Sequence, residues 1–170
     1  SAGDGGTCTI LMVTNLVANI LQGYGNEAQK KEFLVPIAQG KRLGAFCLTQ
    51  PHAGSDAAAI TTHAEKSGAH YVLNGVKQFI TSGKNADLAV VFAVTDRSQG
   101  KRGISAFLVP TSTPGYTVAR IEDKTGQRAS DTAQIVLENC KVPAANLLSG
   151  EGAGYRIALA NLESGRINVA

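Results

Sequence analysis

The stretch His70–Ile80, with the sequence HYVLNGVKQFI, contains two short runs of β-forming residues separated by Asn74-Gly75. Such runs, short and rich in β-branched and aromatic residues, are typical of strands. An Asn-Gly pair between two of them is a strong signal for a two-residue type I′ turn, because both turn positions need a positive φ. We therefore predict strands at His70–Leu73 and Val76–Ile80, joined as a β-hairpin.

On both sides of this stretch, the hydrophobic residues recur with a period of two. This pattern extends the predicted sheet from Gly44 to about Pro143. Turn residues separate these stretches, for example at Ser98–Gly103 and Pro110–Gly115. Many short strands with regular turns are typical of an antiparallel β-barrel or sandwich. The other predicted strands are Gly44–Thr49, Ile60–Lys66, Leu88–Thr95, Ile104–Val109, Thr117–Ile121 and Ala133–Leu137.

The residues before this zone have helical periodicity from Thr9 to about Gln39. Asn26 precedes Gln29 by three residues, which predicts an N-cap and a partial capping box for a second helix. Pro36 is expected to kink or end that helix. The first helix should end at Gly23-Tyr24-Gly25. Its buried apolar stripe should consist of Ile10, Val13, Leu16, Val17, Ile20 and Leu21, and that of the second helix of Phe33, Leu34 and Ile37.

A third zone follows the glycine-rich segment Gly150–Gly154 and is helical again from Tyr155, with Ile157, Ala158, Leu162 and Ile167 near one face. The predicted fold class is therefore α+β. We expect three segments: helical residues 1–40, a β domain at 41–148, and helical residues 149–170. The helical pattern reaches Ala170 without a cap, and nothing precedes the first helix pair for it to pack on. We therefore expect the chain to be the middle of a larger protein.

Composition excludes several classes of partner. The chain has 170 residues, a formal net charge of +3 and 17% charged residues, with no run of five like charges. This balance argues against nucleic acid and against an anionic membrane surface as partners. The longest apolar stretch, Thr9–Leu21, is interrupted by polar residues, so we expect neither a membrane span nor a signal peptide.

The three cysteines, Cys8, Cys47 and Cys140, lie far apart in the sequence. This spacing favours buried free thiols in a reducing compartment over a disulfide framework. The three histidines do not fall at metal-ligand spacing, so no metal site is expected.

The proximity of His52, Ser55 and Asp56 does not predict a catalytic triad. Neighbouring residues cannot place the base between the nucleophile and an orienting acid, and the surrounding sequence is not GxSxG. Turn chemistry is the favoured interpretation of this segment. The glycines at Gly150–Gly154 do not match GxGxxG either, which favours a flexible connection to the last helix.

Two blocks at strand ends carry the candidate chemistry. In the first block, Phe46–Asp56, Pro51 and Gly54 break the chain and leave backbone amides free beside Ser55, an arrangement that can hold a phosphate or a polar ring edge. An ordinary exit from a strand explains this block equally well. The second block, Phe79–Gly83, also combines an aromatic, hydroxyls and a glycine, although core packing is the favoured role for Phe79 alone.

Both blocks resemble signature segments of the acyl-CoA dehydrogenase family. Phe46–Asp56 resembles its T-E-P and G-S-D motif, and Tyr71–Gly83 (YVLNGVKQFITSG) resembles the next signature. The resemblance covers about residues 40–170 in order, and the first helical zone suits the end of the family's N-terminal helical domain. Further matches are GISAFLVP at Gly103–Pro110, DKTGQRASDT at Asp123–Thr132, NCKVPAANLL at Asn139–Leu148, and the helix start at Glu151–Ala170.

The resemblance implies a β-barrel-like middle domain between two helical domains, with FAD as the cofactor between the barrel and the C-terminal helices. It implies that the Thr49 hydroxyl bonds to the flavin ring, that Phe79 lies beside the ring, and that the Thr81 hydroxyl points toward its N5 edge. The full set of implied FAD-binding residues is Phe46, Cys47, Leu48, Thr49, Gly54, Ser55, Phe79, Ile80 and Thr81. The implied acyl-CoA-binding residues are Ser55, Glu163, Ser164, Gly165 and Arg166.

Two positions depart from the family pattern. Gln50 stands where glutamate is commoner, which removes a charge but keeps the size and the hydrogen bonding. Gly165 stands where a few members carry their catalytic carboxylate, immediately before the arginine that matches Arg166. No catalytic residue is therefore expected in this chain, and the general-base glutamate is expected beyond Ala170; Glu163 would point to another face of the helix.

The implied activity is α,β-dehydrogenation of an acyl-CoA thioester to the trans-2-enoyl-CoA, as in fatty-acid β-oxidation. Electrons would pass through FAD to an electron-transfer flavoprotein, and the whole enzyme would be a homotetramer in a bacterial cytoplasm or a mitochondrial matrix. We expect this fragment alone to be inactive. An acyl-CoA oxidase or a flavin monooxygenase on the same scaffold remains an alternative. A non-enzymatic β-barrel interaction module is another, although Thr49 and Thr81 within intact flavin motifs argue against it.

Overall fold

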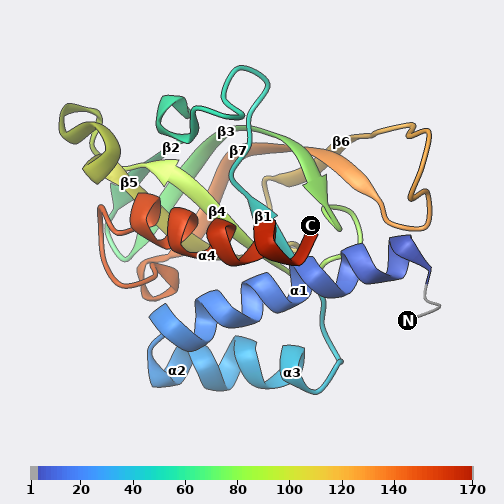
Figure 1. The fold of residues 1–170 in the computed structure, drawn as a ribbon. Helices are drawn as coiled ribbons and strands as arrows, with labels where there is room; N and C mark the ends of the chain where they lie inside the picture. The colour runs from blue at the N-terminus through green and yellow to red at the C-terminus, as the bar shows by residue number, and fades with distance from the viewer. Residues whose placement is uncertain (1–3, 170) are drawn as a thin grey trace.

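The computed structural model describes the backbone of residues 4–169 and the side chains of residues 4–162. A curved seven-stranded sheet carries two long helices, α1 (Gly5–Tyr24) and α4 (Gly154–Val169), side by side on one face (Figure 1). Short helices α2 (Glu27–Gln29) and α3 (Val35–Ala38) flank α1 and are joined by a π-helical turn at Lys30–Leu34. The predicted α+β class is confirmed.

The sheet is mixed, with the strand order β1-β4-β2-β3-β7-β6 and with β5 on the other edge of β4. Both β1 and β2 pair with β4 in parallel, and the remaining pairs are antiparallel. The predicted barrel-like sheet is thus present, but it is not wholly antiparallel. The strands are β1 (Gly44–Cys47), β2 (His63–Ser67), β3 (His70–Thr81), β4 (Leu88–Val94), β5 (Ile104–Pro110), β6 (Tyr116–Ile121) and β7 (Thr132–Pro143), with 3₁₀ turns at Ala57–Ala59, Arg97–Gly103 and Ala144–Asn146.

The predicted hairpin at Asn74-Gly75 is wrong, because β3 runs through both residues as one strand. They form a bulge in the pairing with β7. There the Asn74 Oδ1 accepts a hydrogen bond from the backbone amide of Asn139 at 2.7 Å. Gly75 has φ 148°, and a Cβ there would lie 2.4 Å from the Thr62 hydroxyl oxygen. A bulge uses the same residue types as a tight turn, which explains the error. The hairpin turn lies instead at Gly68-Ala69, between the paired residues Ser67 and His70.

Apolar clusters cover both faces of the sheet. Strand β4 alternates between them: Val90 and Phe92 pack under the helices, while Val91 and Ala93 point into the concave interior of the sheet. Because both of its faces are buried, β4 is apolar along its whole length. The helix-side cluster includes Val17, Ile20, Leu21 and Ile157, and the concave cluster includes Cys47, Leu73, Phe107 and Ile135.

The helix signals of the sequence are confirmed at the N-terminal end. Helix α1 ends at Tyr24, and Asn26 and Gln29 form both bonds of a capping box. Pro36 lies in the first turn of α3, which ends two residues later at Ala38. A π-helical turn lies directly before α3. Proline has no amide N–H to donate, so the regular helical hydrogen bonding is interrupted at this point.

The structure bears on two expectations about the N-terminal helix. Helix α1 is long and apolar enough to cross a membrane, although Val17, Ile20 and Leu21 are fully buried in the core of this protein. Cys8 is exposed on α1, so the prediction that all three cysteines are buried is wrong for this residue. Cys47 and Cys140 are buried free thiols.

Candidate functional site

A pocket of about 450 Å³ opens where the first and second blocks meet α1 and α4, and we call it the hydroxyl pocket. Its volume falls within the range of small-molecule sites. The two blocks supply Phe46, Leu48, Thr49, Gly54, Ser55, Phe79 and Thr81, the 3₁₀ turn after the first block supplies Ala57, α1 supplies Val13 and Leu16, and α4 supplies Leu159 and Leu162.

The first block is held by a tight turn and a buried amide. Gln50 and Ala53 exchange two backbone hydrogen bonds, of 2.9 and 3.1 Å, which form a tight turn through Pro51 and His52. The Gln50 side chain is 3% exposed; its Oε1 accepts the Thr61 amide at 2.8 Å, and its Nε2 donates to the Thr62 hydroxyl. A neutral amide can make both bonds at once, so glutamine fits this position without a charge.

The second block presents an aromatic ring to the pocket through an unusual backbone. A bulge between Lys77 and Ile80 interrupts the pairing of β3 with β7, and Phe79 adopts φ 56°. Phe79 is consequently 62% exposed at the pocket wall, while Ile80 is 1% exposed on the concave side. Left-handed backbone at a non-glycine residue is costly and is concentrated at functional sites, so this geometry marks Phe79 as a binding-site candidate.

Three hydroxyl groups in the pocket are available to a ligand. Within the described part of the chain, the side chains of Thr49, Ser55 and Thr81 make no hydrogen bond, and the amides of Gly54 and Ser55 meet no acceptor. The remaining lining is apolar, and Phe46 is braced by Phe92 at a ring-centroid distance of 4.9 Å. Apolar walls with a few unpaired donors fit a flat ring system with polar edges, so the residues present fit a flavin.

Most of the sequence-predicted FAD residues line the hydroxyl pocket, with two exceptions. The side chains of Cys47 and Ile80 belong to the concave cluster, so only their backbone can face a ligand on the helix side. The predicted acyl-CoA residues Glu163–Arg166 lie in α4, but their side chains are outside the described part of the structure.

The sequence interpretation missed five lining residues, which are Val13, Leu16, Ala57, Leu159 and Leu162. In the helices, the residues that could have been noticed are apolar ones at the edge of the buried stripe. Leu16 is only partly buried, and Leu159 is 45% exposed. An apolar residue beside a helix stripe without full burial indicates a surface that something else covers.

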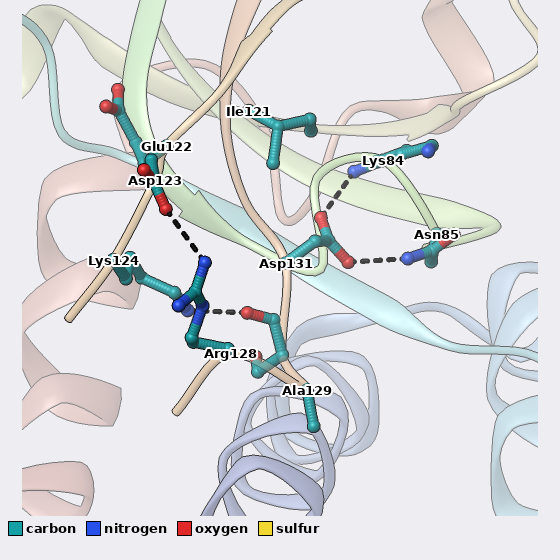
Figure 2. A pocket seen from close by; sticks show the side chains of 10 residues that line it. Lys84, Asn85, Ile121, Glu122, Asp123, Lys124, Arg128, Ala129 and Asp131 are labelled. Atoms are coloured by element: carbon teal, nitrogen blue, oxygen red, sulfur yellow. Dashed lines mark hydrogen bonds and ion pairs between the residues drawn. The ribbon is translucent and has the colours of Figure 1, made fainter. Parts of the chain in front are cut away.

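A second pocket, of about 340 Å³, lies between the Ile121–Asp131 loop and the turn after the second block. Several of its polar groups bond to other residues of the protein (Figure 2). Asp131 accepts the Lys84 amide at 2.9 Å and the Asn85 side chain at 2.8 Å, and Arg128 contacts Asp123 at 3.3 Å. Because its carboxylates already have protein partners, we assign this pocket a structural role, in which Asp131 anchors the turn that ends the second block.

Comparison with known proteins shows to which family the chain is similar. A family model described as the acyl-CoA dehydrogenase middle domain matches residues 45–140, and that of the N-terminal domain matches residues 1–41. The short-chain-specific acyl-CoA dehydrogenase of Megasphaera elsdenii is 48% identical over 98% of this chain and 44% of its own length. The mitochondrial short-chain-specific enzyme of Rattus norvegicus is 44% identical over 100% of this chain and 42% of its own length.

A solved structure from work on the electron transferring flavoprotein of Acidaminococcus fermentans contains a chain that superposes with a TM-score of 0.96. That chain is 48% identical, and the match covers 98% of this chain and 44% of that one. The present chain thus spans less than half the length of these relatives. Similarity of this extent in both sequence and fold shows that the chain belongs to the acyl-CoA dehydrogenase family, whose members are FAD-dependent oxidoreductases.

Proposed function

We propose that this chain forms the FAD-facing part of an acyl-CoA dehydrogenase that converts a short-chain acyl-CoA thioester to the trans-2-enoyl-CoA. Residues 1–40 would be the end of its N-terminal helical domain, 41–148 its middle β domain, and 149–170 the start of its C-terminal helical domain. The observation that carries the proposal is the convergence of both family blocks on one pocket, with an exposed Phe79 and three hydroxyls that bond to none of the described residues.

The residues of the hydroxyl pocket would hold the ring of FAD, which when bound accepts the substrate's β-hydrogen as hydride. Thr49 and Thr81 would donate to polar ring edges from the ends of β1 and β3. Phe79 would cover the ring, while Phe46 and Leu48 exclude water. Fixed donors near the site of developing charge stabilise that charge without reorganisation, which is the contribution expected from these two hydroxyls.

Ser55 and the segment Glu163–Arg166 would bind the acyl-CoA, with Arg166 as a permanently charged anchor for a phosphate. Among the described residues, none that lines the hydroxyl pocket is acidic. As the family resemblance implies, we propose that the carboxylate that removes the α-proton lies beyond Ala170. We place no catalytic residue within this chain.

Partners and location follow from the relatives. We propose an electron-transfer flavoprotein as the electron acceptor, because a similar chain was solved in work on such a protein, and a homotetramer as the whole enzyme. A bacterial cytoplasm or a mitochondrial matrix is the proposed compartment, since the relatives include bacterial and mitochondrial enzymes.

The test uses the protein that carries this chain at its natural length, loaded with FAD. Anaerobic butyryl-CoA should bleach the visible flavin absorbance, and an electron-transfer flavoprotein should restore it much faster than oxygen does. Rapid recovery with oxygen alone would assign an oxidase instead. A protein that binds FAD but is not bleached by any acyl-CoA would contradict the proposed reaction.

A further inference from the structure

Lys77 is buried in the concave interior of the sheet, behind the hydroxyl pocket. Its side chain is 0% exposed, and its Nζ donates to the backbone carbonyl of Leu48 at 3.0 Å. That carbonyl belongs to the peptide bond between Leu48 and Thr49, both of which line the pocket on the other side of the sheet. The amine therefore holds the first block from behind.

Tyr116 of β6 makes the equivalent contact with the second block. Its hydroxyl donates to the carbonyl of Gly83 at 3.1 Å, at the turn that follows Thr81. Gly83 has little room to move, because a Cβ there would lie 2.9 Å from the Cβ of Ala133. The tyrosine thus fixes the end of the second block against β7.

Cys47 belongs to the concave cluster, and its thiol is near enough to Lys77 and Tyr116 to affect the pKa of each. Burial raises the pKa of the Cys47 thiol to about 12 and also raises that of the Tyr116 phenol, so both keep their protons as hydrogen-bond donors. Burying an amine among apolar side chains is expensive, and a methionine of similar shape would remove that cost. Stability alone does not explain a lysine here.

We propose that Lys77 and Tyr116 are positioning residues for the FAD site, and that they hold the backbone of both blocks from the concave interior. Neither side chain lines the pocket, so neither is a catalytic residue. The inference rests on the proposed function for its ligand, but the positioning itself is a property of the protein without FAD.

Hydrogen–deuterium exchange of the ligand-free protein tests the positioning directly. Lys77→Met should speed exchange at the Gln78 amide, which donates to the Thr49 carbonyl at 2.9 Å. Tyr116→Phe, which keeps the ring, should speed exchange at the amides of Gly83 and Ala86, which close the turn after Thr81. Strands β4 and β5 should exchange as in the wild type.

Matched controls come from the same cluster. Leu73→Met changes a buried residue of the same strand, and Tyr71→Phe removes a hydroxyl that bonds to Glu151 rather than to either block. Neither control should change exchange in the blocks. Unchanged exchange in both test variants, or a uniform increase that the controls share, would overturn the proposal.

The second measurement is FAD affinity, read from fluorescence quenching, with the visible circular dichroism of bound FAD as a signature of ring placement. Each test variant should bind FAD about tenfold more weakly, equivalent to about 1.4 kcal/mol, and should alter the dichroism. Wild-type affinity and dichroism in both variants would overturn the role toward FAD. If the wild type itself binds no FAD, the proposed function fails, and the exchange data still decide whether Lys77 and Tyr116 position the blocks. If Lys77→Met does not fold, Tyr116→Phe alone decides both questions.

Discussion

The amine of Lys77 gives this fold a pH dependence of its own. Burial lowers its pKa from the ordinary 10.5 to about 7, and the nearby Cys47 opposes that shift. Between these two values the unfolded chain binds more protons at this lysine than the folded chain does. Its contribution to stability therefore increases as the pH rises through this window and is constant below it.

We predict that Lys77→Met removes a rise in melting temperature between pH 7 and pH 9 that the wild type shows. The range stops at pH 9 because Cys47, whose pKa is raised from 9.0 to about 12, acts with the opposite sign above it. Calorimetry of both proteins across this range is the measurement. Parallel pH profiles for the two proteins would show that Lys77 keeps an ordinary pKa.

Thr81 tests the pocket chemistry at the level of one hydroxyl. Thr81→Val keeps the shape and removes the donor, which should weaken FAD binding by about 0.5–1.5 kcal/mol or shift the flavin potential. Thr117→Val, on the exposed face of β6, is the control and should change neither. Titration with FAD and a potentiometric measurement decide the matter. Unchanged affinity, spectrum and potential in Thr81→Val would exclude the proposed bond.

Among the elements, strand β3 connects the fold with the site. It leaves the Gly68-Ala69 turn, bulges at Asn74-Gly75, and bulges again between Lys77 and Ile80 to expose Phe79. The first bulge lets the strand pass close to Thr62, and the second delivers Phe79 and Thr81 to the pocket. Both bulges change the direction in which side chains point within one continuous strand.

We predict that Gly75→Ala destabilises the protein by about 1–3 kcal/mol, because its Cβ would collide with Thr62. Gly68→Ala should cost about 1 kcal/mol, since it adds only left-handed strain in open space. Urea unfolding of both variants gives the comparison. A smaller cost at Gly75 than at Gly68 would favour an open turn at Asn74-Gly75 over the continuous strand.

The sequence predicted the elements better than their connections. The apolar run of β4 and the capping box at Asn26 depend on local patterns, and both are confirmed. The Asn74-Gly75 hairpin failed because those residues serve a bulge that only the pairing with β7 reveals.

The same limit applies to the site. The blocks around Thr49 and Thr81 carry recognisable motifs, whereas nothing in the local sequence distinguishes Lys77 from an ordinary polar residue of a strand. Its partner, the Leu48 carbonyl, lies 29 residues away in the sequence. The pocket residues of α1 and α4, such as Leu16 and Leu159, could not be assigned before the packing of both helices was known.

For the whole molecule, the chain spans less than half the length of its relatives. We predict that the isolated 170-residue chain does not dehydrogenate any acyl-CoA in the presence of FAD. The physical reason is that the described lining of the hydroxyl pocket offers no carboxylate to remove a proton. Circular dichroism should first verify that the chain is folded, and measurable enoyl-CoA formation would mean that the base lies within it.

The central claim is that the two blocks form the wall of a flavin site, and a crystal structure of the natural-length protein with FAD tests it most directly. We predict that the flavin ring lies against Phe79, with the hydroxyls of Thr49 and Thr81 within hydrogen-bond distance of its polar edges. A flavin bound elsewhere, with the hydroxyl pocket filled by protein side chains, would contradict the account.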